Sequence, residues 1–126
     1  MKKTLVIPGQ LPSLNQYTRE CRSYKLAGAQ MKKRSEKIIS ACIQQQLQEI
    51  HFEGTVKLAF RWYEATKKRD LDNICFAKKF ILDALVNNRT IQADGWKGVV
   101  GFTDNFFLDR ENPRIEVDIE EVGEEV

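Results

Sequence analysis

The feature that most constrains the fold is a strict alternation of apolar and polar side chains over residues 55–64. Every second position there is apolar, namely Val56, Leu58, Phe60 and Trp62. Successive side chains of a β-strand point to opposite faces of the sheet, so this pattern predicts a strand with one buried face and one open face. The chain therefore has to build a sheet that is covered on one side.

The segments before this strand predict one more strand and one helix. A short β-prone run, Thr4–Ile7, ends at a Pro-Gly pair. Residues 8–25 combine turn-forming, basic and aromatic side chains and are expected to form a long ordered loop or a mobile arm. Helical spacings of three and four predict a first helix over 29–50, with these apolar residues on one face: Ile39, Ile43, Leu47 and Ile50.

The segments after it predict a second helix and two more strands. The helix is expected over residues 73–86, a strand opens at Val99, and alternating residues 115–119 form the last strand. The order β-α-β-α-β-β predicts an α+β fold with one small mixed sheet and two helices. Residues 1–126 are predicted to be one domain, in which 120–126 form a frayed acidic tail.

Composition excludes several classes of protein. No apolar run reaches the roughly 18 residues that a membrane span needs. The cysteines Cys21, Cys42 and Cys75 are odd in number and widely spaced, which fits neither a disulfide framework nor a zinc site, and the chain has a single histidine. These observations predict a cytoplasmic protein with reduced thiols, no membrane partner and no organic cofactor.

Charge is distributed unevenly along the chain. Residues 104–126 contain nine acids and two arginines, a charge of −7, whereas residues 1–103 carry +9. The net charge of +2 therefore conceals a basic body with an acidic end. Such a body is a signal, though a nonspecific one, of a polyanionic partner.

Two acids lie where the strand over 55–64 leads into the second helix. They directly follow three cations, in the sequence Lys67-Lys68-Arg69-Asp70-Leu71-Asp72-Asn73. Residues two apart point the same way in an extended segment. Paired carboxylates suit Mg²⁺, which binds one or two of them and completes its shell with water and substrate phosphate. The structural alternative makes Asp72 a helix N-cap and Asp70 a loop acid paired with Arg69.

The second helix and the loop after it extend this candidate site. In one continuous helix, Lys79 and Asp83 each lie about 20° from the face of Asp72, whereas Lys78 lies about 120° away. Lys79 can therefore reach back toward Asp72, pair with Asp83 at i,i+4, or do both. Asp94, in the following loop, is the candidate third acid, and an ordinary turn aspartate is the alternative.

Taken together, these motifs resemble a known family. The chain is similar to the RusA family of crossover-junction endodeoxyribonucleases, small Holliday-junction resolvases often encoded by phages and prophages. The resemblance rests on four segments, residues 7–17, 70–73, 79–85 and 93–94. The combination of Asp-x-Asp-Asn with Lys-x-x-x-Asp-Ala-Leu carries most of it, since Asp-x-Asp alone is common.

The resemblance implies a Mg²⁺-dependent nuclease that works as a homodimer and cuts four-way DNA junctions in recombination and repair. Asp70, Asp72 and Asp94 match the family's three metal-binding catalytic acids. Lys79, four residues before Asp83, matches its catalytic lysine.

Two departures from the family pattern affect these assignments. The gap between Asn73 and the lysine is about one helical turn longer than in the best-known member, which leaves Lys78 open as the catalytic lysine. Ala93 stands where many relatives carry the first of two consecutive aspartates, so Asp94 remains as the single third acid.

DNA contacts are expected from two regions. Lys67, Lys68 and Arg69 are predicted to hold phosphates beside the cut. The remaining predicted contacts come from the N-terminal segment and the second helix: Asn15, Tyr17, Arg19 and Lys78.

The dimer contact and the competing functions complete the sequence-based hypotheses. Apolar residues of the third strand are candidates for the dimer contact, with membership of the core as the alternative: Phe102, Phe106, Phe107 and Leu108.

A second function is a catalytically silent module of the same fold that binds branched DNA. A third is an unrelated α+β protein whose Asp-x-Asp binds a structural cation.

Overall fold

The alternating segments do form one sheet. A computed structural model describes residues 1–123. Its strands are β1 (Lys2–Pro8), β2 (Thr55–Glu64), β3 (Val99–Leu108) and β4 (Arg114–Gly123), in the spatial order β1-β4-β2-β3. Strands β2 and β3 are parallel, and the other neighbours are antiparallel. The predicted α+β class and mixed sheet are confirmed.

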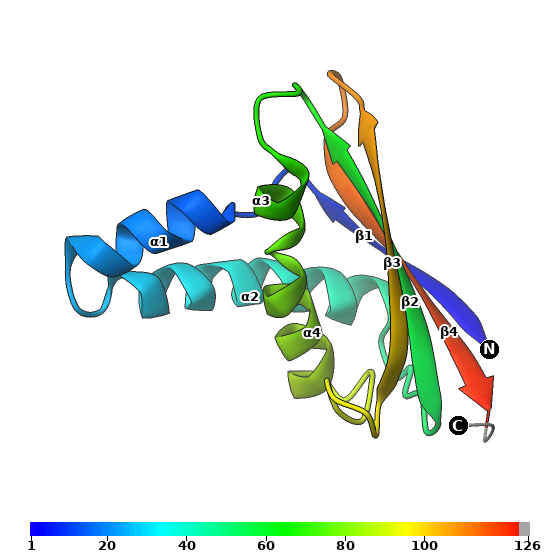
Figure 1. The fold of residues 1–126 in the computed structure, drawn as a ribbon. Coiled ribbons are helices and arrows are strands. Elements are labelled where there is room, and N and C mark those ends of the chain that lie inside the picture. Colours follow the sequence, from blue (N-terminus) through cyan, green and yellow to red (C-terminus); the bar gives the residue numbers. More distant parts are fainter. Residues whose placement is uncertain (124–126) are drawn as a thin grey trace.

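The helices all cover one face of this sheet (Figure 1). They are α1 (Leu14–Ser23), α2 (Ala27–Gln46), α3 (Leu71–Cys75) and α4 (Lys78–Asn87). Helices α1 and α2 form an antiparallel pair that extends away from the sheet, and α3 and α4 cross α2 (Figure 1). The molecule therefore has two layers, with the outer face of the sheet left uncovered by helices.

The core lies between these layers and follows the alternation of the strands. The four alternating apolar side chains of β2 are at most 1% exposed, and Ile115, Val117 and Ile119 of β4 are at most 3% exposed. Each such burial stabilises the fold by about 1.5–3 kcal/mol. The helices contribute the facing side chains, chiefly Ile39, Ile43, Phe80, Ile81 and Leu85.

The prediction of a loop or mobile arm over residues 8–25 is wrong, because residues 14–23 form helix α1. Ser13 and Gln16 build a capping box: the Ser13 hydroxyl accepts from the Gln16 N–H, and the Gln16 side chain accepts from the Ser13 N–H. A Ser-x-x-Gln sequence marks such a start. The prolines and basic residues around this capping signal led to the prediction of a loop instead of a helix.

The single second helix predicted over 73–86 is also wrong, because the chain forms two helices there. At Phe76 and Ala77 the backbone makes i→i−3 hydrogen bonds, from Ala77 N to Ile74 O and from Lys79 N to Phe76 O. This tighter turn changes the rotation per residue. The helical phase that related Lys79 to Asp72 therefore does not apply, and the predicted two helices become four helical segments in residues 1–123.

The acidic end of the chain is not frayed where it is described. Residues 120–123 belong to β4, and Glu120 lies opposite Lys2 of β1 and Lys57 of β2. Residues 124–126 of the predicted tail lie outside the described part of the chain. Within residues 1–123, no helix is long and apolar enough to cross a membrane.

Candidate nuclease site

The two neighbouring acids lie at the start of α3, directly after the loop that leaves β2. Asp70 occupies the N-cap position in an extended conformation, with φ −70° and ψ 155°, but its side chain makes no capping hydrogen bond. Asp72 is in the first turn, and its Oδ1 accepts the backbone N–H of Asn73 at 3.0 Å. Both side chains are exposed. The expected capping role of Asp72 is wrong, and the carboxylate of Asp70 remains available to a ligand.

Asn73 connects this turn to the N-terminal helix. Its side-chain oxygen accepts the backbone N–H of Asn15 at 3.0 Å. The beginning of α1 is thereby held against the beginning of α3. This gives Asn15 and Asn73 a role in positioning the acidic turn, whereas the sequence suggested only a DNA contact for Asn15.

Lys79 and Asp94 lie together at the first turn of α4. The Lys79 ammonium is 3.2 Å from Asp83 Oδ1 and 3.4 Å from Asp94 Oδ2. A hydrogen bond from Lys79 to Asp83, and more weakly one to Asp94, raises the pKa of Lys79. This side chain is therefore a cation at neutral pH. Lys32 of α2 contacts the other oxygen of Asp83 at 3.1 Å and so ties α2 to the same cluster.

The loop that carries Asp94 is shaped by a close approach of its own backbone. Gly98 packs against Ala93 so tightly that any β-carbon at position 98 would collide with the Ala93 backbone. The N–H groups of Gly98 and Val99 both bond to the carbonyl of Gly95, at 2.9 Å. The turn aspartate expected from an Asp-Gly pair is thus part of a defined loop, and its carboxylate still faces Lys79.

Lys78, the neighbour of Lys79, points the other way, toward the sheet. Its ammonium lies 2.6 Å from Asp104 Oδ2 and 4.6 Å from the centre of the Phe102 ring. Asp104 Oδ1 also accepts the indole N–H of Trp62 at 2.9 Å. Lys78 is therefore engaged inside the protein, and of the two candidate lysines only Lys79 contacts one of the three acids.

The three acids do not converge on one point. Among residues 1–123, no three His, Cys, Asp or Glu side chains are close enough together to hold a metal ion. Carboxylates repel one another when no cation lies between them, and a cation such as Lys79 attracts one of them away. The structure brings Asp94 to Lys79 and keeps Asp70 and Asp72 at the N-terminal end of α3.

Some of the side chains predicted to contact DNA are exposed, and others pack against or pair with other residues of the protein. Lys67, Lys68 and Arg19 are exposed. Tyr17 packs on Phe76 and Phe80, with ring centres 5.3 and 5.9 Å apart, and so belongs to the packing between α1, α3 and α4.

Arg69 forms an ion pair with Glu64, a residue that the sequence analysis did not identify. Both guanidinium contacts with the Glu64 carboxylate measure 2.9 Å, and a third nitrogen donates to the carbonyl of Leu11 at 2.9 Å. The expected pairing of Arg69 with Asp70 is wrong. Glu64 is 7% exposed at the end of β2. Glu64 occupies a core-facing position of the strand alternation, where an apolar residue is expected. A charged residue at such a position is the sequence signal that could have identified it.

The comparison with known families agrees with this arrangement. The family model for endodeoxyribonuclease RusA matches residues 8–120. The chain belongs to the RusA family of endodeoxyribonucleases. The matched residues include α1, the acidic turn, Lys79 and Asp94. A search of curated proteins found no match.

Proposed function

We propose that this chain is a Mg²⁺-dependent endonuclease that resolves four-way DNA junctions by paired, symmetric cuts. The observation that carries the proposal is the family match, which spans all four predicted catalytic residues, Asp70, Asp72, Asp94 and Lys79. The exposure of Asp70 and Asp72 at a strand-to-helix turn supports it, because a phosphodiester backbone can reach them without opening the core.

The donor set is chemically suited to Mg²⁺, which prefers carboxylate oxygens. When bound, the ion would neutralise a phosphate oxygen and lower the pKa of an attacking water. Asp70 and Asp72 are the first two ligands in this proposal. Asp94 is the third, and for it to join them its loop has to release the Lys79 ammonium and turn toward α3.

Lys79 acts in this proposal as a fixed positive charge. Its raised pKa makes it unsuitable as a base and suitable for stabilising negative charge on the cleaved phosphate. Release of Asp94 leaves the Lys79 ammonium with Asp83 on one side and an open direction on the other. Lys67 and Lys68, exposed in the loop before Asp70, would hold neighbouring phosphates.

A homodimer is proposed on the basis of symmetry and of one open edge of the sheet. A four-way junction has two-fold symmetry, and two matched cuts need two sites in the same relation. Strand β3 is the last strand of the sheet, and its side chains Phe102, Phe107 and Leu108 are about half exposed. We propose that two β3 strands pair across the dimer axis. Phe106 packs on the core and is not needed for this contact.

A labelled four-way junction, incubated with the protein and either Mg²⁺ or EDTA, tests the proposal. Paired symmetric nicks that require Mg²⁺ are expected. The variants Asp70→Asn and Asp72→Asn should abolish cleavage and keep junction binding, since they remove ligand charge without altering the fold. Lys79→Met should slow cleavage by about 10²-fold.

Two controls make the result specific. Glu111→Gln and Lys37→Met change exposed charges remote in sequence from the acidic turn and should cleave like the unaltered protein. A shifted but uncut band with Mg²⁺ would instead support the silent binding module. Full activity of Asp72→Asn would contradict the assignment of the acids.

A further inference from the structure

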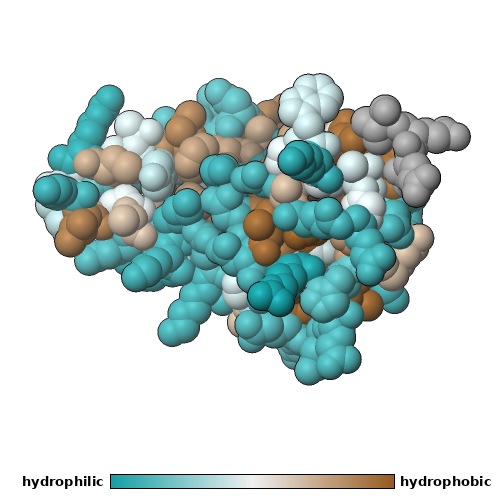
Figure 2. Space-filling view, turned by 90° about the horizontal axis from the view of Figure 1, so that it is seen from below, coloured by the Kyte–Doolittle hydropathy of each residue, from teal (hydrophilic) through white to brown (hydrophobic). Residues whose placement is uncertain are grey.

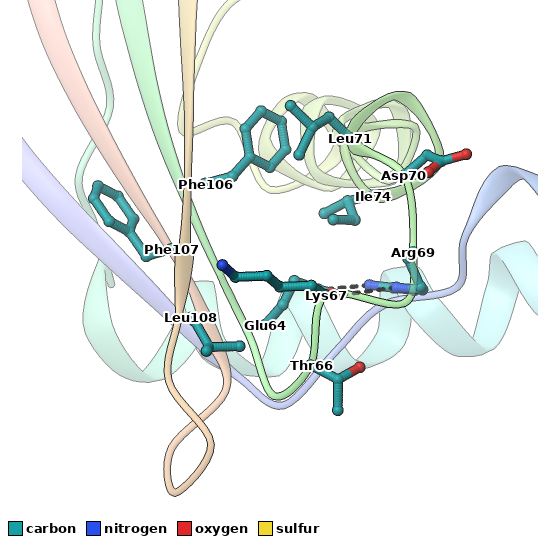
Figure 3. Close-up of a pocket in the computed structure, with 10 residues that line it drawn as sticks. All are labelled: Glu64, Thr66, Lys67, Arg69, Asp70, Leu71, Ile74, Phe106, Phe107 and Leu108. Carbon is teal, nitrogen blue, oxygen red and sulfur yellow. Dashed lines mark hydrogen bonds and ion pairs between the residues drawn. The ribbon is translucent and has the colours of Figure 1, made fainter.

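A cavity of about 330 Å³ lies between the loop after β2, helix α3 and the last residues of β3. Asp70 is one of the residues that border it (Figure 3). Binding sites for small ligands occupy about 300–1,000 Å³, so this cavity is large enough for one ring system and too small for a folded segment. It is separate from the cluster of Lys79, Asp83 and Asp94.

Five of the ten residues that line this cavity are apolar, and the other five are polar or charged. Phe106 and Leu71 lie side by side at one end, with Ile74 beside them, and the Lys67 side chain extends across the cavity toward β3 (Figure 3). The bidentate pair of Glu64 and Arg69 lies below. A carboxylate offers about four acceptor positions, and Arg69 uses two of those of Glu64. The cavity thus presents an aromatic ring, a cation and a buried acceptor.

The side chain of Asp70 points away from the cavity that it borders (Figure 3). The cavity and the carboxylate of Asp70 therefore lie on opposite sides of the protein backbone at residue 70. A ligand that uses both has to place one group in the cavity and another group at the carboxylate. A nucleotide has this division, with its base on one side of the sugar and its phosphate on the other. The base suits aromatic stacking and an acceptor for its N–H groups, and the phosphate suits a metal-binding acid.

We propose that this cavity receives one unstacked nucleobase of the strand that is cut, adjacent to the phosphate at Asp70. Phe106 stacks on the base, Lys67 holds the backbone at the mouth, and Glu64 accepts an N–H of the base edge. Bases at a branch point have lost a stacking neighbour, which lowers the cost of extruding one. This inference rests on the proposed function, because it takes branched DNA as the substrate.

Binding in EDTA tests the base pocket independently of cleavage. The probes are four-way junctions with an abasic nucleotide, or with 2-aminopurine, at each position flanking the cut phosphate. For the unaltered protein, one abasic position should weaken binding about tenfold, the size of one base–aromatic stack. 2-Aminopurine at that same position should gain fluorescence on binding.

Phe106→Ala should weaken binding to the intact junction about tenfold and lose no further affinity for the abasic one. Phe102→Ala is the matched control for the abasic penalty, because Phe102 lies on the same strand and face but does not line the cavity. Its overall affinity is not compared, because Phe102 belongs to the proposed dimer contact. Its abasic penalty should stay intact. Two further variants cover the case in which Phe106→Ala fails to fold. They are Lys67→Ala, with Lys37→Ala as its exposed control, and Leu71→Ala at an exposed wall residue.

Several outcomes would overturn the proposal. One is an equal abasic penalty in the unaltered protein and in every cavity variant. Another is a change of molecular mass in solution that accounts for the effect of Phe106→Ala, because the cavity would then be filled by a second copy. If junctions bind with the expected abasic penalty but are never cut, the pocket stands and the nuclease function fails.

Discussion

The two edge strands of the sheet, β1 and β3, differ in whether another element covers their outer backbone groups. Strand β1 is closed by helix α2: the side-chain amide of Gln46 makes two hydrogen bonds of 2.7 Å with the N–H and the carbonyl of Val6. Strand β3 ends the sheet on the other side, is 10 residues long against 7 for β1, and exposes Phe102 and Phe107.

This difference suggests which edge is available to a partner. An open strand edge is a template for pairing, and proteins that avoid it use covers, charges or prolines. Strand β1 has the Gln46 cover and ends in Pro8. Strand β3 contains no proline, and its one charged side chain, Asp104, is paired with Lys78. Figure 2 shows that some hydrophobic side chains are exposed on a mainly hydrophilic surface.

The charges on the open face of the sheet follow the same division. On this face, Arg61 of β2 contacts Asp118 at 2.6 Å and Glu116 at 2.9 Å, both on β4, the strand that lies next to β1. The residues that β3 contributes to this face are Gly101, Thr103, Asn105 and Phe107. Ion pairs thus link β2 to β4 on this face, whereas β3 contributes no charged side chain to it.

The largest effect is expected from charging the open edge. The double variant Thr103→Lys/Asn105→Lys places like charges where two β3 strands would meet, and should convert the proposed dimer to monomers. Light scattering after gel filtration measures this mass, and junction cleavage should lose its paired, symmetric character. Gln45→Lys, an exposed change on α2 near the closed edge, should leave the mass unchanged. A dimer that persists in the double variant would exclude β3 as the contact.

A smaller effect is expected from Arg61→Met, which removes the centre of the ionic network. Loss of charge-assisted hydrogen bonds to two carboxylates should lower the free energy of unfolding by about 2 kcal/mol at neutral pH. Lys57→Met is the matched control, because Lys57 is exposed on the same face of β2. Urea denaturation measures the difference.

The same variant should also change the pH dependence of stability. Arg61 lowers the pKa of Asp118, and Arg114 together with Arg61 lowers the pKa of Glu116. Carboxyl groups with a lowered folded-state pKa stabilise the fold above their unfolded pKa of about 4, and that stability is lost as the pH falls through the folded value. Denaturation from pH 7 to pH 3 should therefore be steeper for the unaltered protein than for Arg61→Met. Parallel curves would show that the network contributes little.

The smallest effect is expected from uncovering β1. Gln46→Ala removes two hydrogen bonds at an exposed position and should cost about 1 kcal/mol of unfolding free energy. Gln45→Ala, its neighbour, should cost only a few tenths of a kilocalorie, in the range of ordinary surface changes. A new concentration-dependent species in Gln46→Ala alone would show that the cover also prevents association.

Much of the fold was predictable because strand periodicity is local. Strand β2 begins and ends where the alternation does, and its apolar residues are the ones that are buried. Helix α1 was missed because its start depends on a capping box among prolines, which resembles a loop. The break between α3 and α4 was missed because the apolar spacing continues through Phe76 and Ala77.

The candidate site was predictable in its residue types but not in its contacts. The sequence named Asp70, Asp72, Asp94 and the two lysines as candidates from spacing and resemblance, and these roles remain predictions. The choice between Lys78 and Lys79 was left open, because it depends on Asp104, which is 26 residues away in the sequence. The role of Asn15 depends on Asn73, which is 58 residues away.

The sequence by itself determined the strands, their buried faces and the acidic turn, since each follows from neighbours within a few residues. Only the tertiary structure decided which lysine faces Asp94, which edge of the sheet stays open, and that Arg69 pairs with Glu64. The physical reason is that a short-range pattern sets the direction of a side chain from its own element. The partner that it meets is supplied by a different element, and the packing of the two layers brings them together.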